Sequence, residues 1–171
     1  TLWIKEKINS QSTLVLVPTL SLLSQTFREW NFAKNESFDS LCVCSDSTVV
    51  KNSVYDQTIQ SVNELPFSVT DKIEDIKSFL KNNGSKVIFC TYHSSKLIVE
   101  SQVEKNSPVF DLVIADEAHR CTGEEGHAFT HVLDSSLIKS KKRLFTTATS
   151  KTFRANVKKK AEERDININS M

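Results

Sequence analysis

Short apolar runs recur along the sequence and alternate with stretches of helical periodicity. They occupy residues 13–17, 41–44, 86–90, 112–115 and 143–146. A continuous apolar run of this length is typical of a strand that is buried on both faces, as in a parallel sheet. Parallel strands need long crossover connections, which are usually helices. The alternation therefore predicts an α/β fold with a mainly parallel central sheet.

Helical patterns occupy most of the stretches between these runs. Leu20–Trp30 carries an apolar stripe, and Asp71 begins a capping-box pattern that indicates a helix start. Gly84 follows that helix as a stop signal. Residues 45–69 are polar without a clear period, which predicts a long surface loop. The predicted helices are residues 1–9 (a helix end), 20–30, 71–80, 94–104 and 151–164.

The length of 171 residues is sufficient for one domain with a proper core. No apolar run approaches the ~20 residues that a membrane-spanning helix needs, and the start has no signal-peptide pattern. The four cysteines do not form a metal-binding pattern, and unpaired cysteines are typical of a reducing compartment. We therefore expect a cytoplasmic protein, of bacterial or phage type, with no membrane partner.

The net charge of +1 gives no global basic signature, so any contact with nucleic acid must use a local surface. Lys139–Arg143 and Lys158–Lys160 are local candidates for such a surface. A solvated face of charged residues explains each run at least as well.

The strongest chemical signal is a pair of carboxylates, Asp116 and Glu117, directly after the apolar run 112–115. Ligands of open α/β sheets bind at the carboxyl ends of the strands, where two adjacent carboxylates suit nucleotide hydrolysis. Asp116 would hold Mg²⁺ through water, because this ion retains much of its hydration shell. Glu117 would orient and polarise the attacking water, and His119 would lie near the γ-phosphate. The alternative is an acidic helix start, where carboxylates complement the helix dipole.

A second signal is the tripeptide Thr147, Ala148 and Thr149, which follows the apolar run 143–146. Its hydroxyl groups could bond His119 or Glu117 and so couple the nucleotide state to the far side of the domain. A threonine-rich strand end with no such role is the simpler explanation of the tripeptide alone.

Two further strand ends carry polar groups that suit contact with nucleic acid. Pro18 ends the first run, and Thr19 with the helix amides behind it could take a phosphate, with Gln25 following on the helix. Thr91 and Tyr92 have the same placement after another run, where a hydroxyl could contact the backbone and the ring could stack on a base. An ordinary strand-to-helix turn explains either segment in isolation.

The order and spacing of these motifs resemble superfamily 2 helicases of the DEAH type, over the whole chain. The resemblance is closest to large predicted helicases related to single-polypeptide restriction-modification enzymes and to other restriction-type translocases. It implies the first RecA-like motor domain, a three-layer domain that uses ATP and Mg²⁺ and acts on nucleic acid, DNA rather than RNA. The motifs that carry it are Pro18–Thr19, Thr91–Tyr92, Asp116–His119 and Thr147–Thr149.

The sequence departs from the family pattern in ways that limit its chemistry. It contains no Gly-x-x-x-x-Gly-Lys-[Ser/Thr] loop, since its glycines are Gly84, Gly123 and Gly126. In the family that loop precedes the helix that ends here within residues 1–9, and a second RecA-like domain supplies an arginine finger. Ser150 replaces the usual proline after Thr149, and His93 departs from the usual residue after Tyr92.

We therefore expect residues 1–171 to be a partial N-terminal RecA-like domain, which functions with the remaining domains of a parent protein. The parent would be an ATP-dependent DNA helicase or translocase of the kind that takes part in restriction-modification, while this chain alone would be inactive. The alternative is a non-catalytic module that binds nucleic acid or protein and retains a helicase-derived fold.

Overall fold

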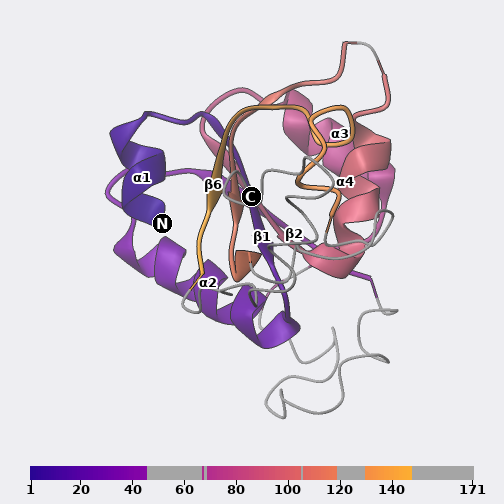
Figure 1. Ribbon diagram of the computed structural model, residues 1–171. Coiled ribbons are helices and arrows are strands. Elements are labelled where there is room, and N and C mark those ends of the chain that lie inside the picture. The colour runs from indigo at the N-terminus through magenta and orange to yellow at the C-terminus, as the bar shows by residue number, and fades with distance from the viewer. Residues whose placement is uncertain (46–66, 68, 105, 119–129, 148–171) are drawn as a thin grey trace, which may run out of the picture.

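A computed structural model describes residues 1–45, 67, 69–104, 106–118 and 130–147. Its strands form one six-stranded sheet of order β3-β2-β4-β1-β5-β6, and every pairing is parallel (Figure 1). The prediction of an α/β fold with a parallel central sheet is thus confirmed. The strands are β1 (Ser12–Val17), β2 (Asp39–Val43), β3 (Val69–Thr70), β4 (Lys86–Thr91), β5 (Phe110–Ala115) and β6 (Ser140–Phe145).

Helices cover both faces of the sheet, which gives three layers (Figure 1). One face packs against α1 and α2, and the other packs against α3 and α4. Of the described residues, none belongs to a helix long and apolar enough to span a bilayer. The helices are α1 (Leu2–Lys7), α2 (Leu20–Ala33), α3 (Ile73–Lys81), the 3₁₀ turn η3 (Tyr92–Ser94) and α4 (Ser95–Ser101).

The core consists of two apolar clusters, one on each face of the sheet. Alternate residues of a strand point to opposite faces, so Leu14 and Leu16 of β1 join one cluster while Val15 and Val17 join the other. All four side chains are at most 1% exposed. Burial on both faces explains why these strands have continuous apolar sequences instead of alternating ones.

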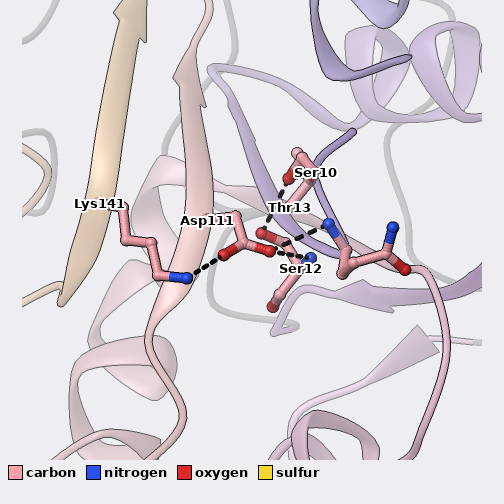
Figure 2. Close-up of polar contacts among 6 residues, drawn as sticks. Ser10, Ser12, Thr13, Asp111 and Lys141 are labelled. Atoms are coloured by element: carbon pink, nitrogen blue, oxygen red, sulfur yellow. Dashed lines mark hydrogen bonds and ion pairs between the residues drawn. The ribbon is translucent and has the colours of Figure 1, made fainter. Parts of the chain in front are cut away.

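An aspartate ties three strands together at the amino edge of the sheet (Figure 2). Oδ2 of Asp111, on β5, accepts hydrogen bonds from the backbone amides of Gln11 (3.0 Å) and Ser12 (3.1 Å) at the start of β1. Its Oδ1 lies 2.7 Å from Nζ of Lys141, on β6. Burial raises the pKa of Asp111, but the bonds from Lys141 and the two amides lower it more, so the net pKa lies below its ordinary value.

The start of α3 differs from the capping-box prediction. The N-cap residue is Lys72, with no side-chain cap, so the assignment of Asp71 as the cap is wrong. Thr70 organises the turn instead: its hydroxyl accepts from the amide of Lys72 (3.1 Å) and donates to Oδ2 of Asp75 (2.6 Å). The helix ends at Lys81, and Gly84 lies beyond it at φ 90°, in the left-handed region that suits glycine.

Other element boundaries also differ from the sequence-based prediction. The last residue of the predicted loop 45–69 belongs to β3, a two-residue strand too short to give an apolar pattern. The predicted helix 94–104 is shorter, because η3 precedes α4 and α4 ends at Ser101. Strand β6 begins at Ser140, three residues before the predicted apolar run. It lies at the edge of the sheet, so its first residues can be polar and exposed and give no apolar pattern. The predicted helix 151–164 lies outside the described residues.

Candidate active site

The two predicted catalytic carboxylates follow β5, whose side chains are buried except for Asp111. The amide of Asp116 donates to the carbonyl of Leu16 on β1 (2.9 Å), and the amide of Thr146 donates to the carbonyl of Ala115 (2.9 Å). Asp116 therefore lies at the carboxyl edge of the sheet, between the ends of β1 and β6. This is the edge at which open α/β sheets bind their ligands.

Asp116 is held on its side chain and on its backbone. The hydroxyl of Thr146, just after β6, donates to Oδ1 of Asp116 over 2.8 Å. The hydroxyl of Tyr92, just after β4, donates to the backbone carbonyl of Asp116 over 2.8 Å. The amide of Ala118 donates to the backbone carbonyl of Thr146 (2.8 Å), so the turn after the two carboxylates is also bonded to the segment after β6.

Glu117 adopts a backbone conformation that is rare for a residue with a side chain. Its φ is 52°, in the left-handed region, which costs an L-residue roughly 1–2 kcal/mol. Such conformations persist where the surroundings over-determine them, and they gather at functional sites. The bonds that Thr146 and Tyr92 make to neighbouring Asp116 provide that constraint. The half-buried Glu117 side chain is thereby placed by a tight turn, not by a regular helix or strand.

The donor set at this edge fits a magnesium ion of the kind that binds through one carboxylate, water and phosphate oxygens. Asp116 is half-buried, and a hydroxyl donor already orients one of its oxygens. Within the described part of the chain, no cluster of three or more His, Cys, Asp or Glu side chains could hold a metal on its own. An ion here would therefore depend on the nucleotide for much of its coordination.

The first predicted nucleic-acid segment lies at the same carboxyl edge, after β1. Thr19 caps α2, because its hydroxyl accepts from the amide of Leu22 (3.2 Å). Gln25 is exposed on α2, and its amide nitrogen donates to Oε1 of Glu29 (2.7 Å). Pro18 is buried directly after β1, and its contact with nucleic acid stays a prediction.

Both side chains of the second predicted nucleic-acid segment are buried. Thr91 is 1% exposed and its hydroxyl donates to Oγ of Ser94 (3.1 Å), while Tyr92 is 0% exposed. Neither side chain reaches the surface, and the Tyr92 ring packs in the apolar core. Contact of this segment with nucleic acid stays a prediction. The sequence pattern placed them correctly at a strand end but could not reveal that the last residue of β4 and the first residue of η3 are both buried.

Thr146 is a site residue that the sequence analysis missed. The predicted coupling tripeptide begins one residue later, at Thr147, which is exposed. Thr146 was assigned only as the end of a strand, and its contact with Asp116 depends on β5 and β6 being neighbours in the sheet. No sequence pattern gives that strand order. His119, Ala148 and Thr149 lie outside the described residues.

The basic run Lys139–Arg143 serves the fold at the opposite end of β6. Nζ of Lys139 donates to the carbonyls of Gln102 (2.7 Å) and Glu104 (3.1 Å). Lys141 pairs with Asp111, and Nε of Arg143 donates to the carbonyl of Val132 (2.9 Å). These three cations therefore make structural contacts, whereas Lys142 of the same run is exposed. Lys158–Lys160 lies outside the described residues.

The three layers, the parallel sheet and the carboxylates at its edge define a RecA-like α/β domain of the helicase type. The chain belongs to the family described as "Type III restriction enzyme, res subunit", which it matches over residues 2–152. This places the chain among helicase-family domains, in agreement with the resemblance drawn from its motifs.

Known proteins that resemble the chain come from a virus and from restriction systems. "Probable helicase A859L" of African swine fever virus is 38% identical over 138 residues in isolate Tick/Malawi/Lil 20-1/1983 and 37% in isolate Pig/Kenya/KEN-50/1950. Each alignment covers 80% of this chain and 14% of the viral protein. The chain thus corresponds to a small part of its curated relatives.

Two solved structures share the fold at a TM-score of 0.65 and 28% sequence identity. One is a nuclease-deletion mutant of the Type ISP restriction-modification enzyme LlaGI in complex with a DNA substrate mimic, and the match covers 86% of this chain and 12% of that one. The other is the ATP-dependent Type ISP restriction-modification enzyme LlaBIII bound to DNA, with 91% and 11% covered.

Proposed function

We propose that this chain is part of the first motor domain of an ATP-driven DNA helicase or translocase. The observation that carries the proposal is the position of Asp116 and Glu117 at the carboxyl edge of the sheet, in a turn that strands β1, β4 and β6 hold from three sides. Membership of a helicase-containing family and likeness to Type ISP restriction-modification enzymes solved with DNA or a DNA substrate mimic support it. The parent protein is the ATP hydrolase.

Within this proposal the two carboxylates have different roles. Asp116 would hold Mg²⁺ through water, with Thr146 fixing the orientation of its Oδ1. The bound ion would neutralise negative charge on the phosphates of ATP. Glu117 would accept a proton from the attacking water and orient it toward the γ-phosphate. His119, two residues further on, would contact the γ-phosphate.

The sequence contains the two carboxylates of an ATP site but lacks the loop that binds the phosphates. It has no Gly-x-x-x-x-Gly-Lys-[Ser/Thr] loop, whose amides and lysine cradle the phosphates. We propose that residues 1–171 are a partial RecA-like domain, and that the rest of the parent protein supplies this loop and a second RecA-like domain. Negligible turnover is expected for the 171-residue chain by itself, because phosphoryl transfer depends mainly on positioning and electrostatic stabilisation.

DNA would bind along the carboxyl edge, near the end of β1. Thr19 and the exposed Gln25 are the contact residues that we retain, since Thr91 and Tyr92 are buried. Thr147, Ala148 and Thr149 would couple the nucleotide state to the DNA. Cys42, Cys44 and Cys90 are buried thiols, which suits a reducing, cytoplasmic compartment.

The test is DNA-stimulated ATP hydrolysis by the full-length natural protein that contains this chain, with and without Glu117→Gln. Loss of a positioned general base lowers rates by about 10²–10⁴-fold, so we expect at least a 100-fold fall in kcat. Binding of ATP and of DNA should change little, because the substitution preserves the shape of the side chain.

Glu74→Gln is the matched control, because Glu74 lies in the exposed first turn of α3. It should leave kcat unchanged. Hydrolysis that survives Glu117→Gln would overturn the catalytic assignment. A natural protein that binds DNA but hydrolyses no ATP would favour the alternative of a non-catalytic binding module.

A further inference from the structure

Tyr92 connects two strand ends that are not neighbours in the sheet. It follows β4, Asp116 follows β5, and β1 lies between these two strands. The Tyr92 hydroxyl nevertheless lies 2.8 Å from the backbone carbonyl oxygen of Asp116 and donates to it. The side chain therefore crosses the carboxyl end of β1 to reach the turn that carries the predicted catalytic carboxylates.

The ring and the hydroxyl of Tyr92 have separable contributions. The ring is 0% exposed and belongs to the apolar cluster that includes Leu16 and Ile98. Phenylalanine would retain this packing, since the two residues share the ring. The hydroxyl is directed at the peptide that joins Asp116 to Glu117. A function of the hydroxyl can thus be tested without removing the ring from the core.

The carbonyl that Tyr92 binds controls the orientation of Glu117. A peptide bond is planar, so fixing the carbonyl oxygen of Asp116 also fixes the direction of the Glu117 amide. Glu117 begins from that plane with φ 52°, a conformation that its own side chain disfavours. Thr146 constrains the side chain of Asp116, whereas Tyr92 constrains its backbone. The left-handed turn therefore has a specific hydrogen-bond donor holding its first peptide.

We propose that Tyr92 is a positioning residue for ATP hydrolysis, which holds the Asp116–Glu117 peptide so that the Glu117 carboxylate is aimed at the attacking water. This inference rests on the proposed function and extends it, because it assigns the motif after β4 to the hydrolytic site. It replaces contact with nucleic acid as the role of this tyrosine. The hydrogen bond from Tyr92 also connects the end of β4 to the peptide that precedes Glu117.

Hydrogen bonds around Ser94, in the same 3₁₀ turn as Tyr92, connect the end of β4 to the segment that follows β2. The Thr91 hydroxyl donates to Oγ of Ser94 (3.1 Å), and the same Oγ accepts from the amide of Ser45 (3.1 Å). Thr91 and Ser94 are at most 2% exposed, so these hydrogen bonds anchor η3 at the end of β4 away from solvent. A side chain that positions another residue needs a backbone that is itself held firmly in place.

The experiment compares Tyr92→Phe with wild type in the full-length natural protein. We expect kcat for DNA-stimulated ATP hydrolysis to fall about tenfold or more, with KM for ATP within about twofold, because the substitution misplaces Glu117 without removing a nucleotide contact. Ser101→Ala is the matched control: it also removes a buried hydroxyl that donates to a backbone carbonyl, that of Ile98 (2.7 Å), but on α4. Its kcat should be unchanged.

A crystal structure of the Tyr92→Phe protein gives a readout that does not depend on activity. We expect Glu117 to leave the left-handed region, with the ring of residue 92 unmoved. Retention of a positive φ at Glu117, or an unchanged kcat, would overturn the inference. A wild-type protein without ATPase activity would count against the proposed function, while the conformation of Glu117 would still decide whether Tyr92 positions it.

Discussion

Thr146 donates a 2.8 Å hydrogen bond to Oδ1 of Asp116. This bond fixes one oxygen of the carboxylate that we expect to hold Mg²⁺, and it leaves the rest of the group for water. The two residues directly follow neighbouring strands, β6 and β5. The register of these strands therefore determines the geometry of the candidate metal ligand.

Replacing Thr146 with valine should weaken the use of magnesium. The substitution preserves the branched shape but removes a hydrogen bond to a charged group, worth about 1.5–3 kcal/mol. We expect the Mg²⁺ concentration for half-maximal ATP hydrolysis by the full-length protein to rise by about tenfold or more, since 1.4 kcal/mol corresponds to a factor of ten. Thr146→Ser retains the hydroxyl and should stay close to wild type. An unchanged magnesium dependence in Thr146→Val would show that the bond is incidental.

The hydrogen bonds that Asp111 accepts from two backbone amides should contribute more to the free energy of unfolding than its ion pair with Lys141 does. Asp111→Ala leaves the amides of Gln11 and Ser12 without this acceptor, and we expect the free energy of unfolding to fall by about 1–3 kcal/mol. Lys141→Ala removes an exposed ion pair and should cost less than about 1 kcal/mol. Urea unfolding of the chain measures both losses. Equal losses would mean that the ion pair, and not the backbone bonds, is what matters.

The effect of Asp111 should also depend on pH. Its pKa is lower in the folded chain than in the unfolded one, so its stabilising contribution is complete above the unfolded pKa of about 3.9. As the pH falls through the folded pKa this contribution is lost. The stability difference between wild type and Asp111→Ala should therefore shrink below about pH 4.

A central strand residue should be far less tolerant of truncation than an exposed residue on α2. Ile88 of β4 is 0% exposed, and Ile88→Ala should destabilise the chain by about 2–5 kcal/mol through lost burial and a cavity. Phe32 is 95% exposed at the end of α2, and Phe32→Ala should change stability by less than about 0.5 kcal/mol. Thermal unfolding followed by circular dichroism will show the contrast. A large loss in Phe32→Ala would indicate that the ring is covered in solution.

His131 should make the chain sensitive to mild acid. Burial, and then the positive charge of Lys96, lower the pKa of His131 below its ordinary value, and its Nδ1 lies 2.8 Å from Oγ of Ser95. The unfolded chain therefore binds a proton near pH 6.5 that the folded chain does not yet bind, so stability should fall as the pH drops below about 6.5. Above that pH His131 should have no titration effect.

The variant His131→Gln isolates this effect, because glutamine does not titrate. Urea unfolding between pH 7.5 and 5 should show wild type losing stability relative to His131→Gln as the pH falls. Lys96→Ala should reduce the difference, since it removes the charge that opposes protonation. Parallel pH curves for wild type and His131→Gln would contradict the assignment.

The sequence predicted the sheet well because its strands are buried on both faces. The runs that became β1, β4 and β5 had continuous apolar sequences, and the carboxylates after the last of them lie where that pattern placed them. Strand β3 was missed, and the prediction of β6 began three residues too late. Both strands lie at the edges of the sheet, where side chains need not be apolar. The error at Asp71 arose because local hydrogen bonds from Thr70 competed with the expected cap.

The contacts of the candidate site depend on strand order, which periodicity does not encode. Nothing in the sequence places Tyr92 against the turn of Asp116, since the two residues follow strands that are separated by β1. The contact of Thr146 with Asp116 has the same origin. Motif order identified which segments gather at the carboxyl edge, whereas the partner of each side chain emerged only from the assembled sheet.

The central place of β1 has a consequence for how the chain is made. Its neighbours are encoded much later: Ser12 pairs with Lys86, and Thr13 pairs with Leu112. At a synthesis rate of about 5–20 residues per second, β1 leaves the ribosome on the order of ten seconds before its second partner is available. During that interval a strand whose last four residues are apolar has at least one edge unpaired. A nascent chain stopped ahead of Phe110 would therefore be a target for chaperones or aggregation, even though most of its sequence had been translated.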